Sequence, residues 1–492
     1  MKKTRFLCLL TAALISASAL FSCANGGNNS GGSDSAGETD EINTAVAVTI
    51  DDFTVTQSMM TYFFNSYYQS FLDKYDGRLS TMGLDIAKPL STQTYKDDYS
   101  WYDFFAANTY AQVKELLYMV QAAHDAGYEL TDSQKTDIDQ IMESYDISAQ
   151  ARKCSLSELF ASIYGANVNE VTVRKCVELQ TVASGYNAML NDERAYTDSD
   201  YEQYFDENYK DFACYSYIGY VTDASGAEAL SACGSSEEFS AKVLDLILAD
   251  DFDGDYENNK AAADSALEQA AVPLGRYSKN SPLAIWAFDE NRAPYDIYVS
   301  EADGSGNITV AMILPAFGSY TRQLTWPVRA LGRSSVLFRD TEPVRNIKYV
   351  LFEENGDTDA AKARESAEKL YSQWQSDPTE DNFDLVCTKA DVSPRMSQGI
   401  RRGDLAPSLG EWIMSEDRRP LDAEVLTYED YGSYFVIMLE NGDPGWLYDV
   451  KDAVADRDYE NTITDLGEKY SVNVDEDVVY TVKEITQQSN AE

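Results

Sequence analysis

The sequence predicts a mixed α+β protein in which a helical N-terminal domain precedes two similar α+β modules. Three observations lead to this prediction. Apolar side chains in residues 45–200 recur mainly at helical spacing. After Tyr209, short runs of β-branched and aromatic residues are typical of strands. Residues 283–313 also align without a gap to residues 409–439, which indicates a duplicated unit.

The chain begins with the pattern of an export signal over residues 1–22. Basic residues at positions 2, 3 and 5 precede an apolar stretch from Phe6 to Leu20. That stretch is shorter than the roughly 20 apolar residues of a comfortable bilayer span, and small residues close it. The run Leu-Phe-Ser-Cys that ends at Cys23 resembles the lipobox of bacterial lipoproteins, whose cysteine receives a diacylglyceryl group. The alternative is an ordinary signal cut nearby, with Cys23 incidental.

Residues 23–44 are expected to form a flexible tether behind that lipid. From Ala24 to Asp40 the composition is mostly Gly, Ser, Asn, Asp and Glu, with nothing more apolar than Ala. Such a segment cannot bury a core and behaves as a coil that reaches roughly 20–25 Å. Signal, lipid and tether together predict a protein held at the extracytoplasmic face of the cell membrane.

The composition excludes several classes of function. The formal charge is −44, and removal of the three basic residues of the signal leaves −47. A surface this acidic argues against nucleic acid as a partner and against a polybasic membrane contact. It favours solubility and repels other anionic surfaces. No later apolar run is long enough to span a membrane.

Histidine and cysteine usage predicts no metal site and no cofactor. His124 is the single histidine, which nearly excludes chemistry that needs His at two positions. Apart from the signal and lipobox cysteines, an odd number remains, without a C-x-x-C motif. Most are expected to be buried small hydrophobes, although a Cys154–Cys176 disulfide stays possible. The remaining cysteines are Cys154, Cys176, Cys214, Cys233 and Cys387.

Start and stop signals place helices within residues 45–200. Capping boxes at Thr131–Gln134 and Ser155–Glu158 are expected to begin two helices, and Gly127 suits the end of the helix before them. Another helix is predicted over residues 168–194. The abundant aromatic side chains of residues 59–72 are expected mostly in the core, with some available to line a groove for unfolded chains.

From Tyr209 onward the pattern alternates between strands and helices. Runs of β-branched and aromatic residues predict strands, and helical spacing predicts helices between them. The predicted elements are strands over Cys214–Val221, Arg345–Phe352 and Ser433–Leu439, helices over residues 224–248 and 358–375, and a loop over Gly399–Leu405.

The duplication rests on ten identities in the 31 aligned columns, where chance would give about two. Upstream, residues 218–221 match residues 347–350 at a slightly larger offset. The aligned tryptophans are expected to anchor the core of each copy rather than to stack on a ligand. Each copy is therefore predicted to form one strand–helix–loop–helix–strand module. The identical pairs are Leu283/Leu409, Trp286/Trp412, Glu290/Glu416, Arg292/Arg418, Pro294/Pro420, Asp296/Asp422, Val299/Val425, Gly306/Gly432, Val310/Val436 and Met312/Met438.

Several segments of the second copy occur in a recognisable order. Arg345-Asn346-Ile347 opens it, a helix over Ala360–Trp374 follows, then come Asn382–Leu385, Gly403-Asp404-Leu405 and Gly432–Ile437. This order resembles a parvulin-type peptidyl-prolyl isomerase domain, with its Arg-His-Ile strand, long helix, Gly-Asp-Leu loop and closing Gly-Tyr-His-Ile-Ile strand. The resemblance covers about 95 residues, and more weakly residues 213–314. With the helical region before it, the chain resembles SurA- and PrsA-like foldases.

At the positions of the family's catalytic residues, the sequence departs from the family. The first-strand histidine falls on Asn346, the closing-strand histidine on Tyr434 and the catalytic-loop cysteine on Val392. In the first copy the histidine positions fall on Tyr217 and Ile308. Asn and Tyr can hydrogen-bond but cannot reproduce a pair of imidazoles. The resemblance therefore implies a peptidyl-prolyl isomerase fold with weak or absent activity.

The family's proline pocket is also shortened. Only three residues separate Leu405 from Leu409, where the family has a longer stretch that carries a methionine. The resemblance nominates Leu405, Leu409 and Met414 as peptide-binding candidates. It also implies that the chain end returns to the helical domain. A helical apolar pattern from Trp446 to Leu466 and a strand over residues 479–485, beside Val46–Ile50, are expected there.

The resemblance implies a membrane-anchored foldase or chaperone for exported proteins, whose partners are unfolded or partly folded exported polypeptides. The alternative is a non-catalytic binding or adaptor lipoprotein of a surface complex. The expected parts are a signal peptide (1–22), a lipidated tether (23–44), a helical domain (45–200), a degenerate first module (201–320), a second module (341–440) and a C-terminal helix and strand (441–492).

A cysteine substitution tests the predicted anchor. In the Cys23→Ala variant the acceptor thiol is gone, so the protein is expected to leave the membrane fraction or to accumulate as an uncleaved precursor. Cell fractionation and metabolic labelling with a radioactive fatty acid measure this. Labelling of the variant at the level of the unaltered protein would refute a lipid on this residue.

Overall fold

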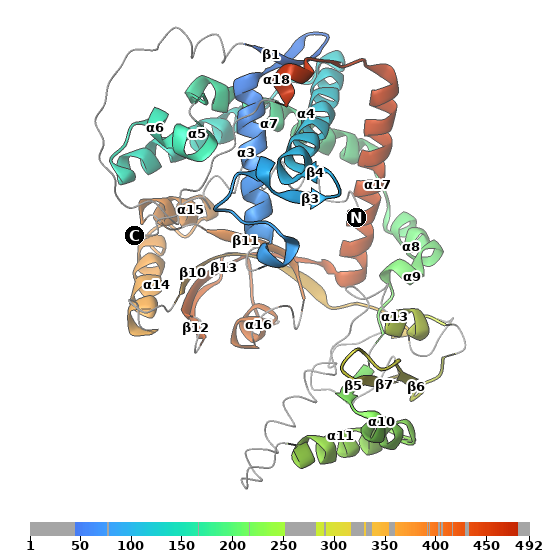
Figure 1. The fold of residues 1–492 in the computed structure, drawn as a ribbon. Coiled ribbons are helices and arrows are strands. Elements are labelled where there is room, and N and C mark those ends of the chain that lie inside the picture. The colour runs from blue at the N-terminus through green and yellow to red at the C-terminus, as the bar shows by residue number, and fades with distance from the viewer. Residues whose placement is uncertain are drawn as a thin grey trace. The chain divides into compact units, whose positions relative to one another are not determined.

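The computed structural model confirms a mixed α+β protein with several small antiparallel sheets and a mostly helical N-terminal half (Figure 1). Contacts group the chain into two compact units. The helical unit comprises the described residues up to Ala195, Glu365–Arg395 and the residues from Val454 onward; the module unit comprises Tyr196–Arg364 and Met396–Ala453. The structure describes residues 45–75, 78–165, 167–215, 217–250, 282–289, 292–315, 329–330, 337–353, 360–390, 392, 394–401, 404, 407–415, 417–428 and 432–480.

The helical unit is built around α3, which packs against α4 and α7. Nearly all large side chains of α3, including Tyr62, Phe64 and Phe71, are buried, as the sequence predicted for residues 59–72. Its elements are β1 (Val46–Ile50), β2 (Phe53–Thr56), α3 (Gln57–Lys74), η1 (Ser80–Met82), η2 (Leu90–Thr92), β3 (Thr94–Lys96), β4 (Tyr99–Ser100), α4 (Trp101–Asp125), α5 (Asp132–Arg152), α6 (Leu156–Tyr164), α7 (Glu170–Arg194), most of α14 (Ala360–Trp374), α15 (Glu380–Lys389), the later part of α17 (Gly445–Lys469), β14 (Asn473–Val474) and α18 (Glu476–Val479).

The predicted helix ends are confirmed. Thr131 and Ser155 each accept a hydrogen bond from the backbone N–H three residues on, and the Gln134 and Glu158 side chains accept from the backbone N–H of the capping residue in return. Gly127 has φ +70°, just after α4 ends. These helix ends could be predicted from the sequence, because a cap depends on only a few neighbouring residues.

The chain end contributes to the helical unit. β14 pairs antiparallel with β1 through Val474 and Val48, and the side chains of Tyr459, Ile463 and Leu466 on α17 pack against the core. The strand expected over residues 479–485 is wrong at its start, because Val479 ends the short helix α18 and is buried in the core. Residues 481–485 lie outside the described residues.

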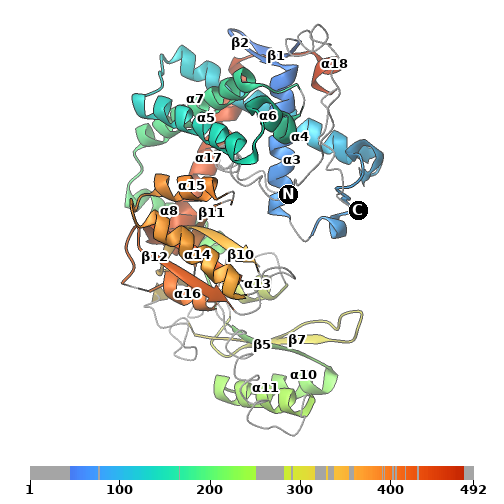
Figure 2. The ribbon, with the colours of Figure 1, turned by 90° about the vertical axis from the view of Figure 1, so that its left-hand side faces the viewer.

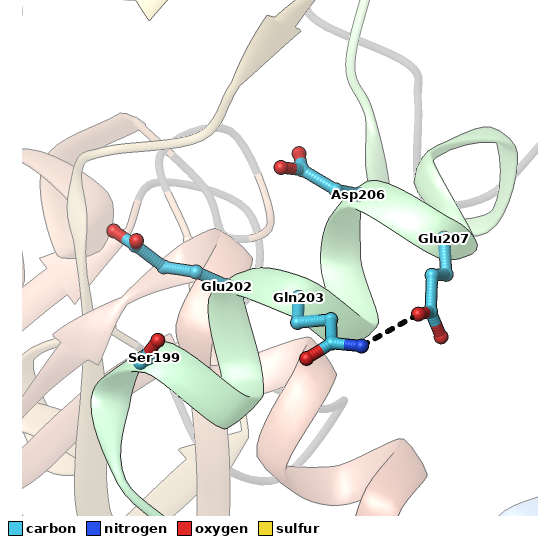
Figure 3. A pocket seen from close by; sticks show the side chains of 5 residues that line it. All are labelled: Ser199, Glu202, Gln203, Asp206 and Glu207. Carbon is cyan, nitrogen blue, oxygen red and sulfur yellow. Dashed lines mark hydrogen bonds between the residues drawn. The ribbon is translucent and has the colours of Figure 1, made fainter.

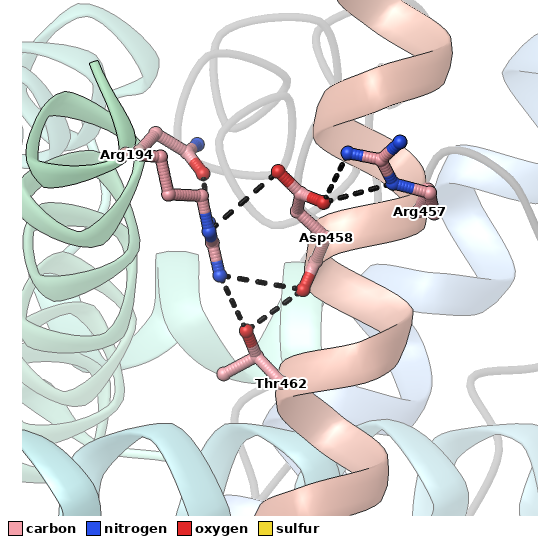
Figure 4. A network of polar contacts seen from close by, with 5 residues as sticks. Arg194, Arg457, Asp458 and Thr462 are labelled. Carbon is pink, nitrogen blue, oxygen red and sulfur yellow. Dashed lines mark hydrogen bonds and ion pairs between the residues drawn. The ribbon is translucent and has the colours of Figure 1, made fainter. Parts of the chain in front are cut away.

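A buried carboxylate joins α17 to α7 (Figure 4). Asp458 is 6% exposed, and its Oδ2 lies 3.5 Å from Nε of Arg194. Its Oδ1 lies 2.8 Å from Nη2 of Arg457. Arg194 also donates to the Thr462 hydroxyl at 2.8 Å. A carboxylate so shielded from water needs these donors, because burying an unpaired charge is costly.

Among the described residues, the module unit holds three antiparallel sheets, with strand orders β5-β7-β6, β11-β10-β13-β12 and β8-β9. Helices α10 and α11 cover one face of the first sheet (Figure 2). The elements are α8 (Asp198–Glu207), α9 (Tyr209–Phe212), β5 (Tyr217–Thr222), α10 (Ala224–Ser231), α11 (Ser236–Asp250), α13 (Pro282–Ala287), β6 (Ile297–Val299), β7 (Ile308–Ile313), β8 (Arg329–Ala330), β9 (Phe338–Arg339), β10 (Pro343–Glu353), β11 (Arg395–Ile400), α16 (Pro407–Ile413), β12 (Ala423–Tyr428), β13 (Gly432–Pro444) and the start of α17.

The opening and closing strands pair in the same register in both copies of the repeat. Ile218 on β5 lies opposite Met312 on β7, and the aligned Ile347 on β10 lies opposite Met438 on β13. The neighbouring hairpin differs by one residue, because Val299 lies opposite Val310 whereas the aligned Val425 lies opposite Phe435. The sequence repeat therefore corresponds to a repeated strand pairing with a local shift at one hairpin.

The corner before each hairpin is also repeated. Arg292 lies over the Trp286 ring at 4.3 Å, and Arg418 lies over the Trp412 ring at 4.6 Å. The aligned Tyr295 and Leu421 both have positive φ, +73° and +67°. At both corners an aspartate caps the backbone three residues before it. The identical residues of the alignment are thus largely those that build this corner.

Two predicted boundaries are wrong. The helix expected over residues 224–248 is two helices, α10 and α11, with a break at Cys233 and Gly234. Gly234 disfavours a continuous helix, because glycine gains backbone freedom when the helix opens. The loop expected from Gly399 begins instead in a strand, because β11 runs to Ile400. None of the helices in the described part of the chain has the length and apolar composition of a membrane span.

Removal of the Asp458 carboxylate tests the contact between α17 and α7. Asp458→Ala is expected to lower the free energy of unfolding of the helical unit by about 1–3 kcal/mol, because the partly buried Arg194 loses its carboxylate partner. The matched control is Asp139→Ala, which removes the exposed ion pair with Arg174 and should cost less than about 1 kcal/mol. Urea unfolding followed by circular dichroism measures both, and equal losses would contradict the assignment.

Candidate functional site

Asn346, which falls on a catalytic histidine of the resembled family, holds two strands together. The residue is 7% exposed, and its Oδ1 accepts a hydrogen bond from the Gly399 N–H at 2.8 Å, which joins β10 to β11. Gly399 has φ +65°, and a Cβ there would come within 2.7 Å of the Tyr448 ring. The carboxamide of Asn346 thus joins β10 to β11 at a crowded point of the sheet, where a residue larger than glycine would collide with Tyr448.

The strand register does not bring Asn346 and Tyr434 together. Tyr434 lies opposite Leu351, five residues along β10 from Asn346. At a rise of about 3.4 Å per residue, the two positions are about 17 Å apart along the strand. The first module repeats this separation, because Tyr217 lies opposite Ile313 and Ile308 lies opposite Thr222. In neither module do the two nominated positions form a shared polar site.

The side chain on β10 that meets Tyr434 is Tyr349. Tyr349 lies opposite Val436, two residues along β13 from Tyr434, so both tyrosines project from the same face of the sheet. Their ring centroids are 5.8 Å apart at an interplanar angle of 52°, and both side chains are half-buried. Sequence reasoning missed Tyr349 because it followed the Arg-x-Ile motif. The repeat gave a usable signal, since it aligns Tyr349 with Tyr220 of the first copy.

Leu409 and Met414 lie on the same face of the sheet as Tyr434. Each is 3% exposed, and both belong to one apolar cluster that Tyr349 and Tyr434 border. Trp412 is part of this cluster, and its indole N–H has no hydrogen-bond partner in the described part of the chain. The structure therefore brings three nominated residues together, although Leu409 and Met414 serve mainly as core. The other members of the cluster are Ile347, Ile400, Ile413, Val436, Met438 and Leu426.

Of the remaining nominated residues, only Val392 is described. It is half-buried in the helical unit, just beyond α15, and its N–H donates to the Cys387 carbonyl at 3.1 Å. Leu405 and the lipobox residue Cys23 lie outside the described residues. The cysteines expected to be buried are largely so: Cys176, Cys214, Cys233 and Cys387 are buried and Cys154 is half-buried, and all five are free, which contradicts a Cys154–Cys176 disulfide.

An acidic hollow lies on α8, lined by Ser199, Glu202, Gln203, Asp206 and Glu207 (Figure 3). Glu202 and Asp206 form ion pairs with Arg339, whose guanidinium lies over the Phe205 and Trp446 rings at 4.4 and 4.7 Å from their centroids. The hollow is therefore part of a structural contact around Arg339. Among the described residues, no group of three or more His, Cys, Asp or Glu side chains could hold a metal ion.

A half-buried arginine joins the residue stretch before β10 to the start of α17. Arg401, just after β11, donates to Asp340 and to the Gly445 carbonyl, each at 2.8 Å, and pairs with Asp449 at 2.8 Å. Burial opposes its charge, but Asp340 and Asp449 outweigh that effect and raise the pKa of Arg401. The start of α17 is thereby held against the strands of the second module.

Chemically, the face around Tyr349 and Tyr434 offers two phenol hydroxyls above an apolar cluster. Phenols donate and accept hydrogen bonds, and aromatic rings provide flat contact surface. These features suit binding of a peptide more than proton transfer by a pair of imidazoles. No protein-family model matches the chain, and the search of curated proteins found no significant match either.

The role of Asn346 is testable through stability. Asn346→Ala leaves the buried Gly399 N–H without its acceptor and should destabilise the second module by about 1–3 kcal/mol. The matched control is Gln398→Ala, because among the described residues that exposed side chain makes one long contact, to Met396 at 3.8 Å. Amide hydrogen exchange of β10 and β11 measures the difference. Unchanged exchange in Asn346→Ala would show that the side chain is free for another task.

Proposed function

We propose that this chain is a membrane-anchored, extracytoplasmic foldase or chaperone that binds exported polypeptides before they have folded, with weak or absent peptidyl-prolyl isomerase activity. The observation that carries the proposal is the duplicated module. Both copies pair their opening strand with their closing strand in one register, and the chain also forms a helical unit that the chain end completes. That combination is what the resemblance to SurA- and PrsA-like foldases implies.

The order of elements along the chain from β10 onward supports the parvulin resemblance, with most of α14 and all of α15 contributed to the helical unit. Strand β10 is followed by helices α14 and α15, strand β11, helix α16 and the hairpin β12–β13, and β13 returns beside β10. The Gly-Asp-Leu segment falls between β11 and α16, where Asp404 accepts a hydrogen bond from the Arg401 N–H at 2.8 Å. The first module has the same opening strand, closing strand and corner, and its described residues form a three-stranded sheet.

The reduced isomerase activity follows from what the reaction needs. Rotation about a prolyl amide has a barrier of about 18–20 kcal/mol, and an enzyme lowers it by binding the twisted amide better than the planar one. In the resembled family, a polar network of two histidines and a cysteine surrounds that amide. Here the Asn346 side chain is hydrogen-bonded to the Gly399 backbone. Tyr434 takes the position of the second imidazole, and its ring contacts the Tyr349 ring. The shape of the apolar face and the desolvation of a bound peptide can still contribute. This supports peptide binding with little isomerase turnover.

The helical unit supports a chaperone role through its aromatic surface. Unfolded chains expose apolar and aromatic segments, and a surface lined by Tyr, Phe and Met suits them. Several aromatic side chains around α3 and α4 are only half-buried, and Met82 and Tyr99 are 38% and 42% exposed. The strong negative charge of the chain keeps such a complex soluble and favours basic clients. The half-buried aromatic residues are Tyr67, Tyr75, Tyr95, Tyr102, Phe104 and Tyr110.

Two activities of the soluble chain (residues 41–492) test this proposal. Turnover of a short Xaa-Pro peptide should lie far below that of a parvulin with intact histidines, because each tenfold of rate requires about 1.4 kcal/mol of differential binding. Aggregation of an unfolded, basic client should nevertheless be suppressed. Light scattering and a proline-isomerisation assay measure the two activities.

Two tyrosine variants test whether the Tyr434 hydroxyl contributes to isomerase activity. Tyr434→Phe removes a hydroxyl and retains the ring, whereas Tyr428→Phe is a control on the neighbouring strand β12. Parvulin-level turnover that disappears in Tyr434→Phe but not in Tyr428→Phe would overturn the proposal in favour of an enzyme with an altered site. Capture of one native partner at fixed stoichiometry, without suppression of aggregation, would favour an adaptor lipoprotein of a surface complex.

A further inference from the structure

The last described segment of the chain lies on the core of the helical unit. Residues 473–480 contain the two-residue strand β14 and the four-residue helix α18, and α18 packs against β1 and α3 (Figure 1). We call residues 473–480 the C-terminal latch. The surface that it covers, here called the latch site, comprises residues 47–49 of β1 and the Tyr102 and Tyr110 side chains of α4.

The latch contacts this site through main-chain atoms and through two valines. β14 pairs antiparallel with β1, and the Asp475 N–H donates to the Ala47 carbonyl at 2.9 Å. On α4, the Tyr102 hydroxyl donates to the Tyr480 carbonyl at 3.0 Å. The side chains of residues 478–479 pack against the core, and the second of them is 1% exposed. Another extended segment with apolar side chains offers the same groups to the site.

The latch is short and largely exposed. Residues 473–477 are all exposed, and Val479 is the buried side chain of the latch. A helix of four residues is not stable on its own, because its first turn is costly to form. Segments that bury few apolar side chains open at a lower free energy than the core beside them. The latch is therefore a part of the helical unit that can open while the core stays folded.

The chain just before the latch has its own anchor. The Tyr470 hydroxyl donates to the Asp125 carboxylate at the end of α4 at 2.6 Å, and Lys469 donates to the same carboxylate at 3.2 Å. Further upstream, Asp458 on α17 pairs with Arg194. These contacts hold the end of α17 in place when the latch opens.

The latch is acidic, like the chain that carries it. Asp475, Glu476 and Asp477 precede its two valines, and the formal charge of the chain is −44. Burial raises the pKa of Tyr110, and the nearby Tyr480 and Glu476 add to this effect, which places Glu476 close to α4. Like charges repel, whereas a segment with lysine or arginine beside its apolar residues is attracted.

We propose that the latch site binds an apolar segment of an unfolded polypeptide, flanked by lysine or arginine, in place of the C-terminal latch. The latch is then a built-in occupant that a client displaces. The inference rests on the proposed function and gives it a binding site for part of the client. The apparent affinity for a client falls with the fraction of molecules whose latch is open. Holding the latch closed must therefore weaken binding, and releasing it must strengthen binding.

A disulfide that holds the latch closed tests the proposal on the soluble chain (residues 41–492). Thr49 on β1 lies opposite Asn473 of the latch on one side and opposite Thr54 of β2 on the other. The Cα atoms of directly opposite residues are about 4.5–5.5 Å apart, which suits a disulfide. Thr49→Cys with Asn473→Cys fixes the latch. Thr49→Cys with Thr54→Cys is the matched control, because it cross-links β1 to β2 instead.

The probe is a short fluorescent peptide, Val-Val-Tyr with two lysines on each side, and fluorescence anisotropy measures its binding. Oxidation of the latch disulfide should weaken binding at least about tenfold, because it removes open molecules, and reduction should restore binding. Oxidation of the control should leave binding unchanged. In the unaltered chain the probe should speed deuterium uptake of residues 473–480 but not of residues 459–469.

A charge substitution releases the latch without a cross-link. Val479→Asp would bury a carboxylate, so the latch should leave its site and the probe should bind more tightly. Val171→Asp adds the same charge on α7, where the valine is 75% exposed, so general attraction of the basic probe is alike. The first substitution should tighten binding at least about threefold more than the second.

Three outcomes would overturn the inference. These are equal probe binding by the oxidised and reduced latch disulfide, probe binding that leaves deuterium uptake of residues 473–480 unchanged, and a folded Val479→Asp chain that binds no better than Val171→Asp. If Val479→Asp prevents folding, the disulfide pair decides. If aggregation of a client is still suppressed when the inference fails, the proposed function stands; a chain that neither binds the probe nor suppresses aggregation would refute both.

Discussion

The pairing of β14 with β1 and the packing of α17 on the helical core are the constraint on which the rest of the structure depends. The chain leaves the helical unit after Ala195, contributes to it again over Glu365–Arg395 and returns for its final stretch from Val454 onward. The two segments between these parts are insertions in a unit whose first described strand, β1, pairs with its last, β14. Loop closure over such a distance costs little more entropy than over a short one, because the cost grows only with the logarithm of length. The contacts of the returning segment, including Asp458, must offset that cost.

Within the module unit, strand alternation decides which residues can act together. A side chain meets its neighbours on the same face of a sheet, and a shift by one residue sends it to the other face. The register of β10 and β13 therefore places Tyr349 beside Tyr434 and sends Asn346 to the far end, where it binds β11. The tyrosine pair therefore lies at the border of the apolar cluster, away from Asn346.

The sequence predicted features that depend on few residues or on a long repeat. The capping boxes at Thr131 and Ser155, the glycine after α4 and the paired opening and closing strands are all seen. The break at Gly234 was missed because apolar spacing continues across it. The helix at Val479 was missed because Val-Val-Tyr has strand propensity, which tertiary packing overrode. The role of Asn346 could not be predicted, since it depends on a glycine 53 residues away in the sequence.

The inserted arrangement of the helical unit also affects the order in which the protein can fold. A chain emerges from its N-terminus during synthesis, and early parts can fold before later ones are made. Helices α3, α4 and α7 appear first, but the surfaces that Tyr459, Ile463 and Val479 cover stay bare until the last stretch emerges. Both modules can form their sheets in the meantime. For that interval the molecule exposes the kind of apolar surface that a chaperone recognises, and the arrival of its own C-terminal helix ends that exposure.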